Sequence, residues 1–434
     1  LLMMLRRLLS ALLALASPFC GLLVSTACAG FGSEIRQLTV PDGGTGGPFG
    51  NSVDLSGTTA VIGHLGDDSF GEGSGAAYVF VLNTGAKLSK LTADDAAGDD
   101  SFGTVVTISG EVVVVGANLD DDHGNGSGSA YVFDATTGQQ QFKLTASDAG
   151  RSAFFGHSVD VSGHVAIVGA HGNGAAGFNA GAAYLFDVTN GQQLFQLTAS
   201  DAHVDDWFGW SVGISGNVAI VGARYADEAG VNAGAAYLFD VATGQQLFKL
   251  TAEDAAPEDD FGWSVAINGD RAIVGAHLDD DNGQFSGSAY VFDVTTGDQL
   301  AKLTASDSAA EDEFGRSVAI FGQTAIVGSS HNKVNGFANG SAYLFDIETG
   351  EQLVKLTANN AMSSSFFGST VALNDRMAIV GAPYHQGQGT AYVFDVPEPD
   401  ASALLALAFA CAAFRRSSIP AADAAGYALW RHCP

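Results

Sequence analysis

A repeat with a period of 53 residues constrains this chain more than any other feature. A Phe-Gly pair returns at that spacing seven times: Phe49-Gly50, Phe102-Gly103, Phe155-Gly156, Phe208-Gly209, Phe261-Gly262, Phe314-Gly315 and Phe367-Gly368. Two further markers keep the same register. A glycine ends each Val/Ile-rich run from Gly63 to Gly381, and a Tyr recurs from Tyr78 to Tyr392, with only its last interval four residues shorter. Three markers in one register indicate a single structural unit used seven times.

Each unit is predicted to form four short β-strands, lettered a to d in chain order. In the fifth unit the predicted strands are Ser264–Ile267, Arg271–Val274, Ala289–Phe292 and Gln299–Leu303. They are rich in β-branched and aromatic residues and are separated by turn sequences such as Asn-Gly-Asp and Thr-Thr-Gly. Four strands in each unit of about 50 residues predict an all-β fold, the β-propeller, whose blades pack around a central channel.

The strand count predicts how the ring closes. Ile35–Thr39 lies 53 residues before the strand d that contains Lys90-Leu91-Thr92, so one lone strand d comes first. Six complete units follow, and the repeats end with strands a, b and c. The sequence therefore predicts a propeller domain, residues 30–395, with seven blades of four antiparallel strands. The N-terminal strand is expected to complete the last blade by pairing with Ala391–Asp395. Closure leaves no open sheet edge, and we expect a monomer.

Charge and composition exclude several classes of protein. The chain has 434 residues, with 18 Lys and Arg against 47 Asp and Glu, for a formal charge of −29. A surface this negative repels the phosphates of nucleic acids instead of releasing their counterions, so we expect no nucleic-acid partner. Hydrophobic residues make up 47% of the chain, which is enough for a large core and excludes a disordered protein.

Residues 1–29 have the pattern of a secretory signal peptide. Arg6 and Arg7 precede the largely apolar run Leu8–Val24, and Ala27-Cys28-Ala29 supplies small residues at a cleavage site. We therefore expect the protein to be exported. All four cysteines lie in the terminal segments, so the repeats are predicted to fold without disulfides.

Residues 396–416 resemble the PEP-CTERM sorting signal of bacterial surface proteins. Val396-Pro397-Glu398-Pro399 precedes the apolar run Ala403–Phe414 and the basic pair Arg415-Arg416. The resemblance implies delivery to the cell surface or extracellular matrix, with membrane contact only through this segment before processing. The apolar run has 12 residues, fewer than the ~20 that span a bilayer. A tail of unknown role, residues 417–434, continues past the point where such signals end. A buried or loosely packed C-terminal helix is the alternative.

The repeat markers resemble the FG-GAP repeat, the blade unit of the integrin α-subunit head and of many bacterial surface proteins. The seventh unit carries both halves of that name, Phe367-Gly368 and, after strand b, Gly381-Ala382-Pro383. The resemblance implies a β-propeller that binds a partner in preference to catalysing a reaction. Many members place an Asp-x-Asp-x-Asp-Gly calcium loop between strands a and b. Here that connection is a tight turn such as Ser162-Gly163 or Asn268-Gly269, so this calcium site does not carry over.

Propeller topology gathers the long acidic loops on one side of the ring. The b–c connections and the crossovers from strand d to the next strand a emerge there, and we call this side the loop face. One crossover position recurs as Asp42, Asp95, Asp148, Asp201, Asp254, Asp307 and Asn360. A structural role explains this recurrence most simply. The alternative is a calcium-binding rim, because dense carboxylates suit that ion; its candidate ligands are Asp120, Asp122, Asp206, Asp259, Asp279 and Asp281.

The second residue after each marker Phe varies around the ring: Asn51, Thr104, His157, Trp210, Trp263, Arg316 and Ser369. Trp210 and Trp263 fall on adjacent blades near the loop face. They either form a platform for a sugar or peptide or fill the space between blades. The marker Phe is predicted to lie in the core, and the Gly after it to admit backbone from the neighbouring blade.

The sequence favours a secreted or cell-surface interaction module over an enzyme. Almost every acid has counterparts in the other units, whereas a catalytic carboxylate pair needs unequal environments. We expect the acidic loop face to bind an extracellular protein or polysaccharide. The alternatives are a carbohydrate-binding lectin that uses Trp210 and Trp263 and a calcium-dependent adhesin of the extracellular matrix. A propeller enzyme that acts on polysaccharide is the least favoured.

Overall fold

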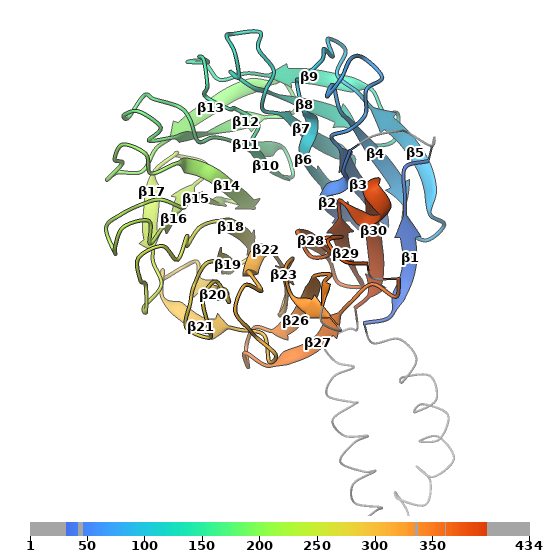
Figure 1. Ribbon diagram of the computed structural model, residues 1–434. Helices are drawn as coiled ribbons and strands as arrows, with labels where there is room; N and C mark the ends of the chain where they lie inside the picture. Colours follow the sequence, from blue (N-terminus) through green and yellow to red (C-terminus); the bar gives the residue numbers. More distant parts are fainter. Residues whose placement is uncertain (1–31, 42–46, 335–336, 361, 397–434) are drawn as a thin grey trace, which may run out of the picture. The chain divides into compact units, whose positions relative to one another are not determined.

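The computed structural model describes residues 32–41, 47–334, 337–360 and 362–396, and Gly32–Val396 forms one compact unit (Figure 1). The predicted signal peptide (1–29), the tail (417–434) and the predicted sorting segment beyond Val396 lie outside the described residues, so they stay predictions. Within the part of the chain that is described, no helix has the length and apolar character needed to cross a membrane.

Seven four-stranded antiparallel sheets hold nearly all of the regular structure. The first three complete blades consist of β2 (Phe49–Ser56), β3 (Thr59–His64), β4 (Ala76–Val81), β5 (Ala86–Leu91); β6 (Phe102–Ser109), β7 (Val112–Ala117), β8 (Ser129–Asp134), β9 (Gln140–Leu144); and β10 (Ser158–Ser162), β11 (Val165–Ala170), β12 (Ala182–Asp187), β13 (Gln192–Leu197). The next three consist of β14 (Phe208–Ser215), β15 (Val218–Ala223), β16 (Ala235–Asp240), β17 (Gln246–Leu250); β18 (Ser264–Asn268), β19 (Arg271–Ala276), β20 (Ser288–Asp293), β21 (Gln299–Leu303); and β22 (Phe314–Phe321), β23 (Thr324–Ser329), β26 (Ser341–Asp346), β27 (Gln352–Leu356). The closing blade consists of β28 (Thr370–Leu373), β29 (Met377–Ala382), β30 (Thr390–Asp395) and β1 (Glu34–Leu38).

The blades surround a central channel, and the ring closes as predicted. Figure 1 shows strand a of each blade, from β2 and β6 round to β28, nearest the channel, with strand d at the rim. In the closing blade β1 pairs antiparallel with β30, and Leu38 lies opposite Ala391. The prediction of a seven-bladed propeller with four antiparallel strands in each blade, closed by the N-terminal strand, is confirmed.

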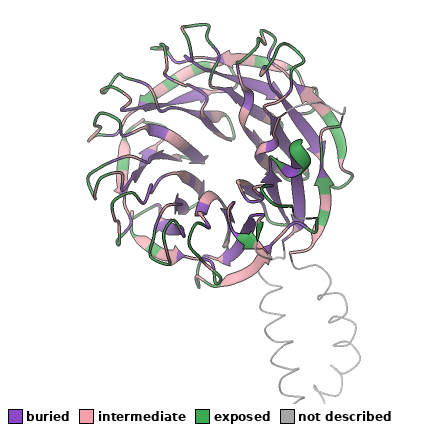
Figure 2. Cartoon of the chain, in the orientation of Figure 1, coloured by how far each residue is buried: buried purple, intermediate pink, exposed green. Residues whose placement is uncertain are grey.

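The core lies between adjacent blades and depends on the marker phenylalanines. Phe102, which is 1% exposed, packs against Tyr131 and Phe133 of its own strand c, with ring centroids 5.5 and 5.8 Å apart. The same cluster includes Val79 and Leu91 from the preceding blade. Burying one such Phe stabilises the fold by ~2–3 kcal/mol. Figure 2 shows the result: the inner strands are buried, and the rim strands and loops are partly or fully exposed.

The glycine after each marker Phe is required by its backbone conformation and by a close approach. Gly209 has φ +87°, in the left-handed region, and a Cβ there would lie 2.3 Å from the carbonyl oxygen of Ala182 in the neighbouring blade. Any side chain would therefore force two blades apart, which confirms the predicted role of this glycine.

Hydrogen bonds of one kind at the rim join six of the seven pairs of adjacent blades. Gln140 Oε1 accepts the backbone N–H of Asp94 at 3.0 Å, and Gln193 does the same for Ser147 at 2.9 Å. At the closure, Glu34 takes this role for the N–H of Asn359 at 2.9 Å. The ring therefore closes with the same contact that holds its other blades together.

Two short elements within the b–c connections were not predicted. β24 (Lys333–Val334) pairs with β25 (Phe337–Ala338) above the blade β22–β27, and a 3-10 helix, η1 (His385–Gly387), follows β29. Both lie in loops, where the 53-residue pattern is least regular, and neither changes the blade architecture.

Candidate binding face

Each blade carries a polar cluster of the same design at the loop face. The crossover before strand a supplies the recurring acid, and the b–c connection supplies one or two more side chains. Strand c supplies the marker Tyr, and strand d supplies Lys in five blades and Gln in two. Since these positions recur every 53 residues, a departure in one blade shows where that blade differs.

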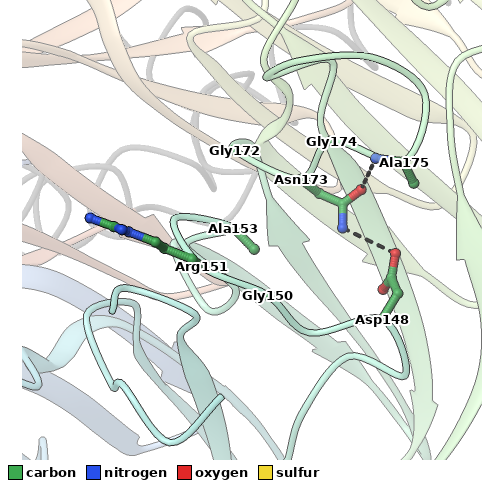
Figure 3. A pocket seen from close by; sticks show the side chains of 8 residues that line it. All are labelled: Asp148, Gly150, Arg151, Ala153, Gly172, Asn173, Gly174 and Ala175. Carbon is green, nitrogen blue, oxygen red and sulfur yellow. Dashed lines mark hydrogen bonds between the residues drawn. The ribbon is translucent and has the colours of Figure 1, made fainter. Parts of the chain in front are cut away.

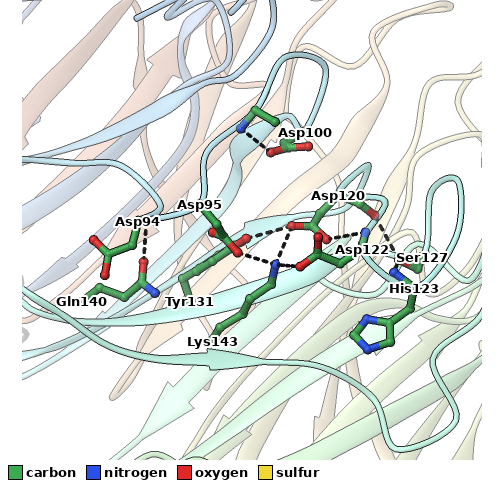
Figure 4. A network of polar contacts seen from close by, with 11 residues as sticks. Asp94, Asp95, Asp100, Asp120, Asp122, His123, Ser127, Tyr131, Gln140 and Lys143 are labelled. Atoms are coloured by element: carbon green, nitrogen blue, oxygen red, sulfur yellow. Dashed lines mark hydrogen bonds and ion pairs between the residues drawn. The ribbon is translucent and has the colours of Figure 1, made fainter. Parts of the chain in front are cut away.

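In the blade β6–β9, a lysine lies among three carboxylates (Figure 4). Lys143 Nζ lies 2.7 Å from Asp95 Oδ2 and 2.9 Å from Asp120 Oδ2. It also lies 2.5 Å from Asp122 Oδ2. Burial opposes ionisation of Asp120, but hydrogen bonds from Lys143 and Tyr131 outweigh it and lower the pKa of this carboxyl. Burial likewise opposes the charge of Lys143, whose pKa is nevertheless raised by the three carboxylates.

Four of the six predicted calcium ligands lie in two such groups. Each group brings three carboxylates within 4.8 Å of one another: Asp95 with Asp120 and Asp122, and Asp254 with Asp279 and Asp281. In the second group Lys302 repeats the contacts of Lys143, at 2.5 to 2.9 Å. The oxygens are of the type that calcium prefers, but an ammonium group already lies where they converge. The residues therefore fit a lysine better than a resident ion.

The remaining predicted calcium ligands, Asp206 and Asp259, belong to neither group. Asp206 Oδ2 accepts the backbone N–H of His203 at 2.6 Å, and Asp259 Oδ2 accepts that of Ala256 at 2.7 Å. Both carboxyls are buried, and burial raises their pKa, to about 6 for Asp259. Each caps a crossover turn, so the six residues do not form one kind of site.

The recurring crossover acid bonds to the blade that follows it. Asp148 Oδ1 accepts the hydroxyl hydrogen of Tyr184 at 2.6 Å, and Asp307 Oδ1 accepts that of Tyr343 at 2.9 Å. Asn360 does the same for Tyr392 at 2.9 Å. These contacts bear out the simpler, structural interpretation of the recurrence. Asp42 lies outside the described residues.

The blade β10–β13 keeps the design of the cluster and loses its charge. Three positions change together from charged to neutral: Asp120 to Asn173, Asp122 to Ala175 and Lys143 to Gln196. Asp148 remains, and its Oδ2 accepts a hydrogen bond from Asn173 Nδ2 at 3.1 Å (Figure 3). It also accepts one from Gln196 Nε2 at 3.0 Å. Amide groups here replace the lysine that neutralises the neighbouring blade.

A second group of side chains lies where the inner strands begin, at the loop-face end of the channel. Trp210 in β14 and Trp263, directly before β18, contact each other with ring centroids 5.1 Å apart. The guanidinium carbon of Arg224 lies 4.5 Å from the ring centroid of Trp210 and 4.3 Å from that of Trp263. This is cation–π geometry, and Asp260 balances the charge at 3.5 Å. The structure thus brings the two predicted tryptophans together under one arginine.

Three histidines extend this group along adjacent blades. His157 lies 4.4 Å from Trp210 between ring centroids, and His277 lies 4.1 Å from Trp263. Burial lowers their pKa to about 4 and about 3. Burial also lowers the pKa of His171, which contacts Trp207, to about 2. All three rings are therefore neutral at physiological pH. We call this group the aromatic crescent: His157, His171, Trp207, Trp210, Arg224, Trp263 and His277.

Backbone conformation presents part of the crescent. The residue before the marker Phe is left-handed in six blades, with φ +56° at Trp207. That conformation is strained for a bulky residue. Ser101 adopts it too, at φ +58°, so the repeat imposes it and the Trp only occupies it. The crescent therefore differs from the other blades in its side chains and not in its backbone conformation.

Several crescent nitrogens are buried without a hydrogen-bond partner among the described residues: His157 Nδ1, His171 Nδ1, His277 Nδ1 and Arg224 Nε. A buried polar atom left unpaired costs ~1–3 kcal/mol. Such atoms in a folded protein call for an explanation such as a ligand or ordered water. The same is true of His385 Nδ1 outside the crescent, so these buried atoms do not by themselves mark a ligand site.

The seven repeats match a model described as the FG-GAP repeat, over residues 33–80, 86–133, 139–186, 192–239, 245–292, 298–345 and 351–394. The chain belongs to the FG-GAP repeat family. A search of curated proteins finds no match to it. Each FG-GAP match begins near strand d of one blade and ends in strand c of the next, so the first and last matches share the closing blade.

The FG-GAP inner strands also hold a half-buried acidic group beside the channel. Thr107 Oγ1 lies 2.9 Å from Asp54 Oδ2 and 3.0 Å from Asp160 Oδ1. A hydroxyl has one hydrogen, so it can donate to only one of the two carboxyls. The other short contact requires a proton on a carboxyl. Burial raises the pKa of Asp54 to about 6, and burial together with Asp54 raises that of Asp160 to about 7.

Sequence reasoning missed most of the crescent and the whole channel group. Trp210 and Trp263 stood out because Trp is rare, whereas Arg224 and the histidines are ordinary residues. A signal was present in a second variable position, two residues after the strand b glycine: Leu65, Asn118, His171, Arg224, His277, Ser330 and Pro383. Comparing two variable positions across the FG-GAP units would have placed these side chains side by side.

Proposed function

We propose that this FG-GAP protein is an exported, non-catalytic interaction module whose loop face binds an extracellular glycan at the aromatic crescent. The crescent is the observation that carries the proposal. It spans only the blades from β10–β13 to β18–β21, while the position two after the marker Phe is small and polar in three other blades: Asn51, Thr104 and Ser369. The repeat does not require it.

The chemistry of the crescent suits a sugar. Indole rings offer flat apolar faces for the C–H side of a pyranose ring. His171, His277 and Arg224 are buried, so the half-buried indoles of Trp207, Trp210 and Trp263 are what the crescent offers a sugar. A few polar groups among aromatic side chains are typical of small-ligand sites.

Two features support export and a non-catalytic role. The pattern of residues 1–29 is that of a secretory signal, and the segment 396–416 resembles a surface sorting signal. The carboxylates of the loop-face clusters are paired with lysine, tyrosine or backbone groups. Acids held in this way are not free to act as a general acid and base.

A protein partner is the second candidate, favoured by exposed apolar side chains on the loop face. Phe178 is 71% exposed, Phe337 61% and Val231 60%, and all three lie in b–c connections. Isolated apolar tips among carboxylates suit a basic protein surface with apolar side chains. They lie on three different loops, whereas the crescent side chains contact one another.

A glycan array probed with the purified full-length protein tests the proposal. We expect saturable binding to a set of related glycans and loss of that binding in Trp210→Ala. Trp210→Phe keeps a ring in place and should retain part of the affinity. Phe70→Ala removes an aromatic ring, 55% exposed, from the loop after β3 and serves as the matched control. Binding that survives Trp210→Ala in a folded protein would refute the crescent as the site.

A further inference from the structure

We propose that the closing blade carries a second sugar-binding subsite, formed by Phe366 and Tyr384, and that one glycan chain occupies this subsite and the aromatic crescent together. We call these two residues the closing-blade pair. The inference rests on the proposed glycan-binding function and narrows its ligand to a neutral chain of several sugar units.

The closing-blade pair repeats an aromatic pair of the blade β14–β17. Trp207 directly precedes a marker Phe, and Tyr225 lies three residues after the glycine of strand b. Phe366 and Tyr384 occupy the same two positions three repeat periods further along the chain. The other five units have at most one aromatic ring of Phe, Tyr or Trp there: Pro48 and Gly66, Ser101 and Leu119, Phe154 and Gly172, Asp260 and Leu278, and Glu313 and His331. The repeat therefore does not require the pair.

The two pairs have the same geometry. The ring centroids of Trp207 and Tyr225 lie 4.9 Å apart, with the ring planes at 61°. Those of Phe366 and Tyr384 lie 5.6 Å apart, with the planes at 72°. Trp207 and Phe366 also share a left-handed backbone, with φ +56° and +53°. One backbone conformation thus presents an edge-to-face aromatic pair at the loop-face end of the inner strands in both blades.

The closing-blade pair is open to solvent. Tyr384 is 57% exposed, and Phe366 is half-buried. In the blade β14–β17 the hydroxyl of Tyr225 contacts Arg224, whereas Pro383 occupies the position of that arginine in the closing blade. Within the described parts of the chain, no group forms a hydrogen bond with the Tyr384 hydroxyl. Tyr384 therefore offers a sugar both an apolar ring and a hydroxyl group.

Contacts between side chains run from the crescent to the closing-blade pair. The guanidinium carbon of Arg316 lies 5.2 Å from the ring centroid of Trp263, and Arg316 Nη1 lies 2.7 Å from Glu313 Oε2. His331 Nδ1 lies 3.1 Å from the same oxygen, and its ring lies 5.0 Å from that of Phe366. Arg316, Glu313 and His331 are half-buried. The two aromatic sites are therefore joined by polar groups that can bond to hydroxyls.

A chain of several sugar units is the ligand that this arrangement fits. The blades that begin with β18 and β22 separate β14 from β28 around the channel, so a single sugar reaches only one of the two aromatic pairs (Figure 1). A chain that contacts both gains affinity, because the second contact is intramolecular once the first has formed. The charge of Arg316 is already balanced by Glu313, so a neutral chain meets no unpaired charge between the sites.

An array of neutral oligosaccharide ladders tests the inference, with β-1,4-, β-1,3- and α-1,4-linked chains from disaccharide to octasaccharide. We expect the full-length protein to bind the longest members of a bound ladder about 100-fold more tightly than the shortest. Tyr384→Ala should remove this gain and leave the binding of short chains at the crescent. Tyr384→Phe keeps the ring and should keep most of the gain. Phe70→Ala removes a ring of similar exposure, 55%, and should change nothing.

The outcomes separate the second subsite from the crescent. Trp210→Ala should weaken the binding of every member of the ladder, because it removes part of the crescent itself. Equal affinity for all lengths, or a gain with length that persists in Tyr384→Ala, would overturn the second subsite and leave glycan binding intact. Binding confined to charged glycans outside the ladders would overturn it too. If the natural protein binds no glycan at all, the proposed function itself fails.

Discussion

The adjacent blades β6–β9 and β10–β13 share one backbone design and differ in what they present to solvent. In the first, Lys143 neutralises three carboxylates, and in the second, amides surround a single carboxylate beside an open cavity. The core marker is the same in both, since Phe102 and Phe155 are each at most 1% exposed. The comparison teaches that the repeat fixes the core and the crossover contacts, while the charge of the loop face changes where one blade departs from the pattern.

The largest loss of stability should come from substituting the buried marker Phe that both blades share. We expect Phe102→Ala and Phe155→Ala each to lower the free energy of unfolding by ~3–5 kcal/mol, because each leaves a cavity between blades. Urea denaturation measures both. A large loss in one variant and little in the other would show that the two cores are not equivalent.

The next largest loss of stability should differ between the two blades. Lys143→Met leaves three converging carboxylates without a counter-charge, and we expect a loss of ~2–4 kcal/mol. Gln196→Met removes hydrogen bonds from an uncharged amide to Asp148 and Tyr184, at a cost of ~1–2 kcal/mol. The two variants form a matched pair at equivalent positions, measured by the same denaturation experiment. Equal losses would contradict the role assigned to the lysine.

A pH titration examines a contact that links the inner strands β2, β6 and β10 of three adjacent blades. Thr107 of β6 bridges Asp54 and Asp160, and backbone N–H groups of Ile108 and Ile214 also face the two carboxyls. The same register position is uncharged in the other blades: Gly213, Ala266, Ala319 and Ala372. The pair therefore has no further charged neighbour at this level of the inner strands.

Because folding raises the pKa of both carboxyls, they stabilise the fold fully below their ordinary value near 4, and that stability is lost as pH rises through about 6 and 7. We expect the free energy of unfolding to fall by ~1–3 kcal/mol between about pH 5 and about pH 8. Asp160→Asn mimics the protonated form and should flatten this part of the profile. An unchanged profile in that variant would refute the shared proton.

The smallest expected effect is that of calcium. Since Lys143 and Lys302 lie where the carboxylates converge, we expect EDTA or added calcium to leave the melting temperature of the natural protein unchanged. In Lys143→Met the same carboxylates are free to bind the ion, and millimolar calcium should recover part of the lost stability. A lower melting temperature of the natural protein in EDTA would instead support the alternative of a calcium-dependent adhesin.

The ring could be predicted because each blade repeats the same local sequence pattern. The marker Phe, the two glycines and the Tyr recur at one spacing, and the predicted strands of the fifth unit agree with β18 to β21 within two residues at each end. The lone strand at Ile35–Thr39 sufficed to predict the closing blade, which β1 completes. Regular spacing carries this information without any knowledge of side-chain contacts.

The site was predicted only in part, because its contacts join positions that are far apart in the sequence. Trp210 and Trp263 are 53 residues apart, and neither neighbours Arg224 in the chain. The acidic rim was visible from composition, but the lysines that neutralise it come from strand d, more than twenty residues after the acids they bind. Whether a carboxylate is free, bonded to a backbone N–H or paired with a lysine depends on these contacts between different strands and loops.

Tryptophan fluorescence during a glycan titration tests the central claim most directly, because three of the four tryptophans of the chain, Trp207, Trp210 and Trp263, lie in the aromatic crescent. With a glycan selected on the array, we predict a saturable change in emission whose midpoint equals the calorimetric dissociation constant. Tight binding that leaves the emission of all these tryptophans unchanged would place the ligand elsewhere and contradict the account.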